Sequence, residues 1–339
     1  MIKVAIAGFG KIGQVRLKEL KKNQNTKVTA VYDYKKPEEL EDDIRFCETF
    51  EDLISQDIDA LFVCAFNNVL AEYTTKALKA GKHVFCEKPP AKTSKELQMV
   101  ITTEKESGKI LKYGFNHRYH HSVIEAKKII DSGEMGKILW LRGVYGKAGS
   151  IDYDKNWRNY KEISGGGILI DQGIHMLDLM RYFSGQNFTH INSIIGTSYW
   201  KIEAEDNAFV IMQSNEKVTA MLHSSATQWK HKFLLEMCFE NGHINLDGIT
   251  SPTGSYAPEK LVVGKRQTED IELAMGKPKE EIILFKNDNS WKLEIDEFID
   301  AILGNGTIKN GSSDEAIKTL ELVEKIYKNS GFYDDKSNI

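Results

Sequence analysis

A run of apolar residues that passes directly into three closely spaced glycines constrains this chain more than any other feature. Residues 3–7 read Lys-Val-Ala-Ile-Ala, and residues 8–13 read Gly-Phe-Gly-Lys-Ile-Gly. A continuous apolar run is typical of a strand buried in a parallel sheet, and helical periodicity follows it. In such a unit the glycines make the tight turn, let the backbone approach a pyrophosphate, and pack helix on strand. The pattern predicts a dinucleotide site at the N-terminus of a helix.

A second predicted strand ends in an acidic residue. Residues 28–33 read Val-Thr-Ala-Val-Tyr-Asp, so Asp33 lies about 20 residues after Gly13, where a ribose-binding carboxylate is expected. Its charge would repel a 2′-phosphate, which favours NAD. Lys35 and Lys36 follow closely and leave NADP possible.

Strands and helices alternate up to about residue 120. Further strands are predicted at 59–65, 82–86 and 110–115, and glycines close the helices between them. This order predicts a doubly wound parallel sheet in a first, NAD(P)-binding domain of residues 1–120. Such sheets bind ligands at the carboxyl ends of their strands. Candidate residues follow three of these ends: Asn67, Glu87 and Asn116.

The pattern then changes to long segments with alternating apolar and polar residues. These segments predict mostly antiparallel strands in a large open sheet, in a second domain of residues 121–339 that binds substrate. The expected strands are 138–145, 207–213, 218–224 and 233–239, and the expected helices are 121–132, 291–303 and 314–328. Residues 249–279 read as loops and an excursion at the sheet edge. Helices would cover one face of this sheet. The other face favours a homodimer or homotetramer through the open sheet.

Composition excludes several other classes of protein. The net charge of −4 gives no general case for binding nucleic acid or an anionic membrane. No apolar run is long enough to span a bilayer, and the N-terminus enters a strand without room for a signal peptide, so a cytoplasmic protein is expected. The four cysteines lack metal-ligand spacing and read as buried, reduced thiols.

The first chemical candidate is Glu87-Lys88-Pro89, at the end of a predicted strand. At the mouth of a dinucleotide crevice, the Lys88 ammonium would stabilise the alkoxide-like charge that develops during hydride transfer. Glu87 would hold that ammonium in place. An ordinary surface lysine is the alternative interpretation.

The second candidate lies after Gly165-Gly-Gly, where Asp171 and His175 are four residues apart. If the chain is helical after Gly167, the two side chains share one face, and a histidine beside a carboxylate is a tunable proton carrier. Metal binding competes with this interpretation, but no third ligand has convincing spacing, so no metal is predicted. A histidine satisfied within a helix–sheet contact is also possible.

Taken together, these motifs resemble the Gfo/Idh/MocA oxidoreductases, which include glucose–fructose oxidoreductase and inositol dehydrogenase. The resemblance rests on the glycine turn, Ala80–Pro89, Asn116-His-Arg118, Gly133–Ile138, Trp157-Arg158 and Gly165–Asp178. It implies a Rossmann domain, a C-terminal α/β domain with a large open sheet, and hydride transfer between a nicotinamide and the CH–OH carbon of a sugar, cyclitol or nucleotide-linked sugar.

The resemblance also assigns roles. Lys88 would polarise the reacting oxygen, His175 would accept or donate the proton, and Asp171 would place the substrate and the histidine. Trp157 and Arg158 would close over the cofactor. The expected cofactor-binding residues are Gly8, Phe9, Gly10, Lys11, Ile12, Gly13, Asp33, Asn67, Glu87, Asn116, Trp157 and Arg158.

One departure concerns the loop after the strand at 59–65. Many relatives carry Thr-Pro there with a histidine four residues after the proline, whereas this chain has Ala65-Phe66 and Leu70. Contacts between this loop and the cofactor therefore stay open, and Phe66 would lie near the adenine or in the core. The residues proposed to line a substrate pocket, or to be ordinary loop residues, are Tyr145, Lys147, Asp152, Asp154 and Asn156.

The sequence is also compatible with two other functions. One is a dinucleotide-binding sensor without turnover, which would have no reason to keep both Lys88 and His175. The other is a sugar-processing enzyme with tightly bound NAD and no net redox change.

Overall fold

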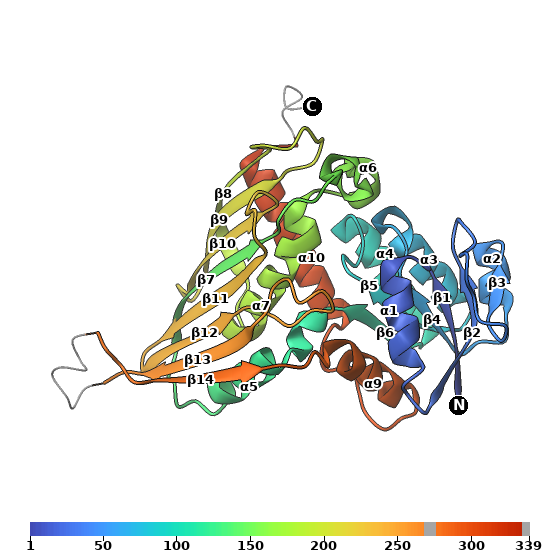
Figure 1. The fold of residues 1–339 in the computed structure, drawn as a ribbon, viewed down its shortest axis with the longest axis horizontal. Helices are drawn as coiled ribbons and strands as arrows, with labels where there is room; N and C mark the ends of the chain where they lie inside the picture. Colours follow the sequence, from blue (N-terminus) through green and yellow to red (C-terminus); the bar gives the residue numbers. More distant parts are fainter. Residues whose placement is uncertain (268–275, 334–339) are drawn as a thin grey trace. The chain divides into compact units, whose positions relative to one another are not determined.

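The computed structural model describes residues 1–267 and 276–333, and the chain forms two compact units. The first unit contains Met1–Asn116, Glu162–Gly165 and Trp291–Glu321. The second contains His117–Lys161, Gly166–Ser290 and Leu322–Ile339. Each unit has its own sheet (Figure 1).

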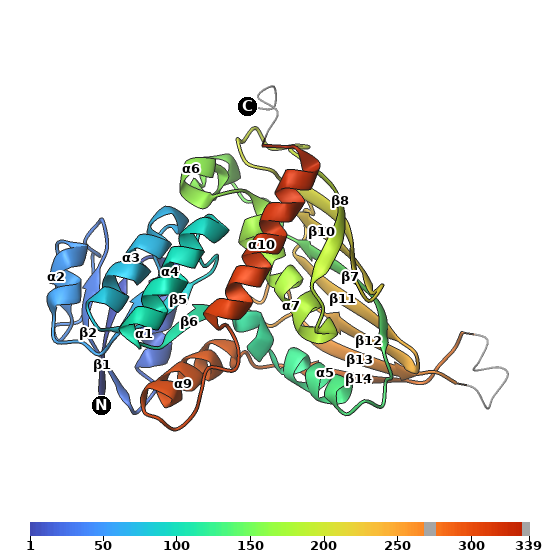
Figure 2. The ribbon, with the colours of Figure 1, turned by 180° about the vertical axis from the view of Figure 1, so that it is seen from behind.

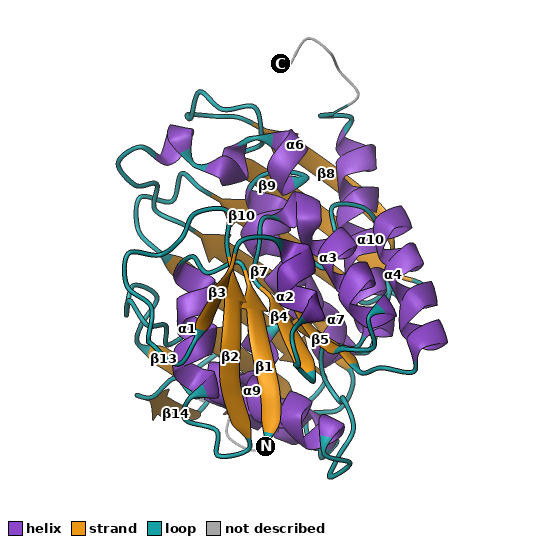
Figure 3. Ribbon diagram, turned by 90° about the vertical axis from the view of Figure 1, so that its right-hand side faces the viewer, coloured by secondary structure: helices purple, strands orange, loops and turns teal. Residues whose placement is uncertain are grey.

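The sheet of the first unit has six parallel strands in the order β3-β2-β1-β4-β5-β6. Figure 3 shows β1 between β2 and β4, the position at which the strand order reverses. This arrangement confirms the predicted doubly wound sheet. The strands are β1 (Ile2–Ala7), β2 (Thr26–Tyr32), β3 (Arg45–Cys47), β4 (Ala60–Val63), β5 (His83–Glu87) and β6 (Leu111–Gly114).

Helices on this sheet come from both ends of the sequence. The N-terminal ones are α1 (Lys11–Leu20), α2 (Phe50–Ser55), α3 (Asn67–Lys79) and α4 (Ser94–Ser107). The late helix α9 (Ser290–Ile302) brings Phe298 into the core, edge-on to the stacked rings of Phe62 and Phe85. Core packing of this unit therefore depends on a helix encoded far from the strands that it covers.

The sheet of the second unit has eight described strands in the order β14-β13-β12-β11-β7-β10-β9-β8. All neighbours are antiparallel except β7 and β10, so the predicted, mostly antiparallel open sheet is confirmed as a mixed one. The strands are β7 (Ile138–Gly146), β8 (Phe188–Gly196), β9 (Asn207–Ser214), β10 (Thr219–Ser225), β11 (Lys232–Phe239), β12 (Gly242–Asp247), β13 (Glu259–Lys265) and β14 (Glu280–Phe285).

Helices pack on one face of this second sheet. Figures 1 and 2 show α5 (His121–Asp131) and α7 (Ile174–Ser184) on that face, in contact with β12, β13, β7 and β10. The last helix is α10 (Ser313–Ser330), whose C-terminal end meets β8 where Ser193 Oγ donates to the Ile326 carbonyl at 2.9 Å. The remaining helical segments are η1 (Asn116–Tyr119), η2 (Tyr153–Lys155), η3 (Trp157–Asn159), α6 (Lys161–Ser164) and η4 (Leu169–Gly173).

Two local predictions need correction. The prediction of loops from 249 to 279 is wrong for Glu259–Lys265, which form β13 with Leu261 and Val263 buried, while residues 268–275 lie outside the described part of the chain. The segment after Gly167 is helical, but Leu169–Gly173 form a π turn before α7 begins. A π turn closes i to i+5 hydrogen bonds, so the simple α-helical spacing argument does not apply to Asp171.

All four cysteines are free thiols, and the expectation that they are buried holds for two of them. Cys47 and Cys86 are buried, and Cys64 and Cys238 are half-buried. Burial raises the pKa of the Cys86 thiol to about 12, so this residue beside Glu87 stays protonated and acts as a packing group. In the described ranges no helix is long and apolar enough to cross a membrane.

Candidate functional site

The three glycines of the first turn differ in what surrounds them. Gly8 has φ +91°, and a Cβ there would lie 2.5 Å from the Cys64 backbone. A Cβ on Gly13 would lie 2.1 Å from the Gly8 carbonyl oxygen, whereas a Cβ on Gly10 would meet nothing within 4 Å. The fold itself therefore requires Gly8 and Gly13. The space beside Gly10 is open, which fits a backbone that a pyrophosphate approaches.

Helix α1 begins directly after Gly10, and no side chain caps its N-terminus in the described structure. Its first amides and the positive end of its dipole suit an anion. Asp33 follows β2, and its carboxylate accepts a hydrogen bond from the Phe9 amide, which fixes it beside the turn. The turn, the helix terminus and the carboxylate fit a dinucleotide.

The predicted cofactor residue Asn67 and its neighbour Phe66 both belong to the first unit. Asn67 begins α3, and its Nδ2 donates to the Ser164 carbonyl at 2.8 Å. Phe66, just before it, is 36% exposed and lies beside the ring of Tyr34, so it is not a core residue.

Glu87 ends β5 and is anchored by a buried arginine that the sequence reasoning missed. Arg16 Nε donates to Glu87 at 2.7 Å, and its terminal nitrogen donates to Glu294 at 2.7 Å. The guanidinium also lies between the rings of Phe85 and Trp291, at 4.3 and 4.5 Å from their centroids. Burial raises the pKa of Glu294 to about 7, although Arg16 opposes that shift. Lys88 is half-buried after this strand, and its bond to Pro89 is cis.

In the second unit, His175 lies in the first turn of α7 and is buried against His117. The two imidazole rings stack with centroids 3.8 Å apart and planes 17° apart. His117 Nε2 lies 2.9 Å from the Tyr145 hydroxyl. Two protonated rings in this stack would repel, so the pair favours at most one imidazolium.

A buried ion pair fixes η1, the segment that carries His117, onto α7. Arg118 donates to both carboxylate oxygens of Asp178, at 2.7 and 2.6 Å, and both side chains are almost fully buried. A bidentate pair of this kind restricts both distance and orientation. It therefore positions His117 over His175.

Asp171 lies in the π turn, and two cations flank its carboxylate. Arg158 Nε donates to it at 3.2 Å, and Lys147 Nζ lies 3.9 Å away. Burial, and then the charge of Asp171, raise the pKa of the Tyr256 hydroxyl, which keeps that phenol protonated. The predicted residues Lys147 and Arg158 thus meet Asp171 inside one unit.

The glycine run before this turn is explained by Glu205, a residue that sequence reasoning also missed. Its buried carboxylate accepts hydrogen bonds from the amides of Gly167 and Leu169 at 2.8 and 2.9 Å, and from the Tyr327 hydroxyl at 2.7 Å. A Cβ on Gly167 would lie 2.1 Å from the Glu205 carbonyl oxygen. The run of three glycines without a nearby capping side chain was the signal that a distant residue supplies the cap.

The predicted site residues divide between the two units. In the first unit are Gly8, Phe9, Gly10, Lys11, Ile12, Gly13, Asp33, Asn67, Glu87, Lys88 and Asn116; in the second are Trp157, Arg158, Asp171 and His175. Of the suggested pocket residues, Tyr145 and Lys147 lie near Asp171, Asp152 pairs with Lys155, Asn156 accepts from the Arg158 amide, and Asp154 is exposed.

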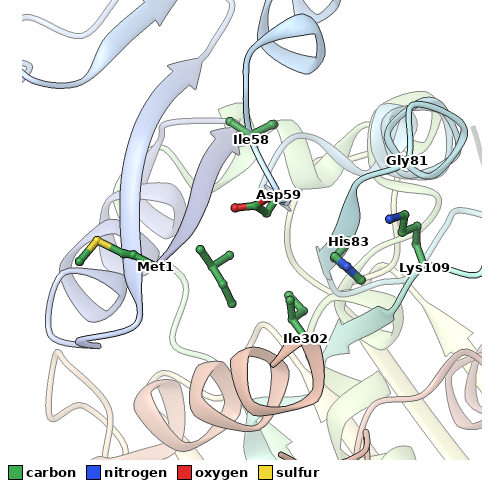
Figure 4. A pocket seen from close by; sticks show the side chains of 8 residues that line it. Met1, Ile58, Asp59, Gly81, His83, Lys109 and Ile302 are labelled. Carbon is green, nitrogen blue, oxygen red and sulfur yellow. The ribbon is translucent and has the colours of Figure 1, made fainter. Parts of the chain in front are cut away.

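No group of three or more potential metal ligands gathers within the described ranges. A cavity of about 300 Å³ in the first unit lies at the amino ends of β1, β4 and β5, away from the strand ends that carry the glycine turn and Lys88. Figure 4 shows Asp59, His83 and Lys109 among the side chains around it.

Comparison with known proteins matches both halves of the chain to one family. Residues 2–115 match the model described as the oxidoreductase family, NAD-binding Rossmann fold, and residues 123–245 match the GFO/IDH/MocA C-terminal domain. The chain belongs to the Gfo/Idh/MocA family. Its first unit therefore contains an NAD(P)-binding Rossmann domain of the Gfo/Idh/MocA type.

Related Gfo/Idh/MocA chains include sugar and cyclitol dehydrogenases. Levoglucosan dehydrogenase of Pseudarthrobacter phenanthrenivorans is 36% identical over 42% of this chain and 36% of its own length, and D-glucoside 3-dehydrogenase of Escherichia coli is 36% identical over 42% and 40%. The alignments thus span well under half of these two enzymes. Inositol 2-dehydrogenase of Salmonella paratyphi B is 29% identical over 79% of this chain and 82% of its own.

Solved structures show the same Gfo/Idh/MocA fold. A levoglucosan dehydrogenase complex with NADH and levoglucosan has a TM-score of 0.83 at 19% identity, covering 97% of both chains. Aldose-aldose oxidoreductase from Caulobacter crescentus has a TM-score of 0.80 at 24% identity, again covering 97% of both. At these identities the likeness establishes the fold alone.

Proposed function

We propose that this chain is an NAD-dependent oxidoreductase that transfers hydride between the nicotinamide and a CH–OH or keto carbon of a sugar, cyclitol or nucleotide-linked sugar. The observation that carries the proposal is the buried His175, which stacks on His117 at 3.8 Å and lies four residues after Asp171, a carboxylate flanked by two cations. The names of the related dehydrogenases support the substrate class.

The proposed roles follow from the chemistry of each side chain. In oxidation, His175 takes the hydroxyl proton as the C–H hydride leaves, and it returns that proton in reduction. The Lys88 ammonium stabilises negative charge on the reacting oxygen. Asp171, oriented by Arg158, accepts a hydrogen bond from a substrate hydroxyl. When bound, the nicotinamide supplies the hydride acceptor or donor.

The preference for NAD over NADP rests on Asp33. Its carboxylate, fixed by the Phe9 amide, carries negative charge where a ribose 2′-phosphate would otherwise sit. Lys36, one of the two lysines that leave NADP possible, lies over the Phe46 ring, 5.8 Å from its centroid. Because Asp33→Ala removes this negative charge, the variant should bind NAD and NADP with more similar affinities.

Two substitutions test the proposed chemistry. His175→Asn should lower kcat by roughly 10²–10⁴-fold, the usual contribution of general acid–base catalysis. Lys88→Met should lower kcat while NAD still binds, as measured by fluorescence titration. Unchanged turnover in His175→Asn would contradict the role of the histidine, and loss of NAD binding in Lys88→Met would make Lys88 a cofactor contact instead.

One relative favours a second candidate, a reaction without net redox change. 2,7-Anhydro-N-acetylneuraminate hydratase of Mediterraneibacter gnavus is 27% identical over 78% of this chain and 73% of its own length. Release of free NADH during turnover, followed at 340 nm, distinguishes a dehydrogenase from this candidate. A sensor without turnover would show neither a cofactor redox change nor any converted sugar across a panel of sugars.

We also propose that the uncovered face of the second sheet joins copies of the chain. Large apolar side chains are exposed on the neighbouring strands β8, β9 and β10 and on the edge strand β14, namely Ile194, Phe209, Ile211, Met221, Ile282 and Leu284. An apolar surface of this extent is costly in water. Native mass spectrometry should show a dimer or tetramer, and Ile211→Glu should shift it toward the monomer.

A further inference from the structure

Three loops emerge at one end of the second sheet. Ser225, at the end of β10, pairs with Gly146 of β7 and with Asn207 of β9, so the chain enters or leaves all three strands at this end. The loops are 147–160 after β7, 197–206 between β8 and β9, and 226–231 between β10 and β11. The first of them supplies the two cations that flank Asp171.

Each loop contributes an aromatic side chain to one cluster. The aromatic platform consists of Tyr153, Tyr199, Trp200 and Trp229. Ring centroids are 4.8 Å apart for Tyr153 and Trp200, 5.2 Å for Tyr199 and Trp200, and 4.8 Å for Tyr199 and Trp229. These separations are those of rings in contact, and most pairs meet edge to face.

The platform has a fixed base and an exposed outer surface. At the base, Tyr153 is buried with Ile168, and Trp200 Nε1 donates to the Ala226 carbonyl at 3.0 Å. At the outside, Tyr199 is 63% exposed and Trp229 is 58% exposed. Trp229 also has φ +56°, a conformation that is uncommon for a residue other than glycine. Two large rings presented to solvent on a rigid base are typical of a binding surface.

The platform is continuous with the Asp171 site. Lys147 Nζ lies 3.9 Å from the Asp171 carboxylate and 5.5 Å from the centroid of the Tyr153 ring. The base residue Ile168 directly precedes the π turn that holds Asp171. A molecule bound at Asp171 and extended past Lys147 would therefore approach the platform from the Tyr153 side.

We propose that the aromatic platform is a second sugar subsite, which stacks the outer ring of a neutral glycoside whose inner ring is bound at Asp171. This inference rests on the proposed function. The flat face of a pyranose carries C–H groups that bury apolar area against an aromatic ring. The charges of these loops favour a neutral ligand, because Arg158 and Lys147 face Asp171 and Lys155 pairs with Asp152.

The test compares one-ring and two-ring substrates. The probes are methyl β-D-glucopyranoside and cellobiose, with their α-linked counterparts methyl α-D-glucopyranoside and maltose, assayed with NAD at 340 nm. Trp229→Ala should lower kcat/KM for the two-ring sugars by roughly 10-fold, the scale of one lost aromatic contact. It should leave the methyl glucosides within about 2-fold, and Trp229→Phe should restore most of the loss. Equal effects on one-ring and two-ring sugars would overturn the subsite.

A binding measurement separates failure of the subsite from failure of the proposed reaction. Saturation-transfer NMR with cellobiose and maltose should show contact to both rings in the wild-type protein and loss of the outer-ring signal in Trp229→Ala, whether or not turnover occurs. Turnover of methyl glucosides without outer-ring contact would overturn the subsite alone. Lack of redox turnover with outer-ring contact retained would overturn only the proposed reaction.

Further measurements test whether a nucleotide or a second copy of the chain occupies the platform instead. Lys230→Ala, an exposed change in the same loop, should leave all four sugars unaffected. If Trp229→Ala and Lys230→Ala instead weaken only UDP-glucose, the outer ligand is a nucleotide and the neutral glycoside is wrong. If Trp229→Ala changes the subunit number in native mass spectrometry, the platform is an interface between copies.

Discussion

The imidazole of His175 lies face to face with that of His117, and Arg118, the next residue after His117, is locked to Asp178 on the same helix as His175. This ion pair therefore joins the segment that carries His117 to the helix that carries His175. In the role proposed for His175, a general base needs a fixed orientation as much as a suitable proton affinity, since small misplacements cost large factors in rate. The ion pair provides that orientation from inside the protein.

Replacement of His117 should separate orientation from chemistry. His117→Ala leaves a space beside His175, and we expect kcat to fall by about 10²-fold because the imidazole loses its position. His117→Phe keeps a flat ring and should retain more activity. Steady-state kinetics at 340 nm, with near-ultraviolet circular dichroism as the control for folding, measures both. Equal losses in the two variants would show that His117 acts through its nitrogens instead.

Two glycines of the first turn should respond differently to alanine. Gly10→Ala places a methyl group in open space, so the fold should persist while NAD affinity falls by about 10-fold, equivalent to about 1.4 kcal/mol. Gly13→Ala places it 2.1 Å from the Gly8 carbonyl oxygen and should lower the melting temperature strongly. Thermal melts and NAD titrations of both variants check this. Matched destabilisation by the two changes would contradict a ligand-facing Gly10.

Glu294 should make the first unit less stable as pH rises. Its pKa is raised to about 7 in the folded protein, against an ordinary value near 4.5. Between these values the folded state holds a proton that the unfolded state has released, so the free energy of unfolding falls with pH, by up to about 3 kcal/mol. Glu294→Gln removes this dependence. Urea denaturation should show that the free energy of unfolding of the variant, relative to that of the wild type, is higher at pH 8 than at pH 5.

Glu259 should have the opposite dependence in the second unit. Burial raises its pKa, but His120 and the amides of Thr250 and Ser122 lower it to about 2 overall. Stability from this carboxylate is therefore present above pH 4.5 and lost as pH falls toward 2, a range of about 3 kcal/mol. Glu259→Gln should destabilise the protein most at pH 7 and least near pH 3. A constant difference across this range would rule out the ionised carboxylate as the source.

Local patterns in the sequence predict those parts of the molecule whose partners are near in sequence. The strands around the glycine turn are continuous apolar runs, and the helices between them end at glycines with positive φ, such as Gly108. Strand β13 was missed because glycine, proline and lysine around it obscure the alternation of Leu261 and Val263. Strand β8 was also missed, because Ile194 lies on its exposed face and breaks the alternation of buried apolar and exposed polar residues.

The site shows the same limit more clearly. Its motif residues were identifiable, but their supports come from far away in the chain: Glu294 is 278 residues from Arg16, and Glu205 is 38 residues from Gly167. Periodicity carries no information on such pairs. The π turn at Leu169–Gly173 also escapes a helical-wheel argument, because it inserts one residue into an otherwise regular helix.

The place of Phe298 in the core has a consequence for synthesis of the protein. All six strands of the parallel sheet have been translated once residue 114 is made, yet the aromatic ring that completes the stack of Phe62 and Phe85 arrives only with α9. During the interval a nascent chain exposes apolar surface that the finished protein hides. The parallel sheet can therefore begin to form early in synthesis, but its core is completed only after Phe298 of α9 has been added.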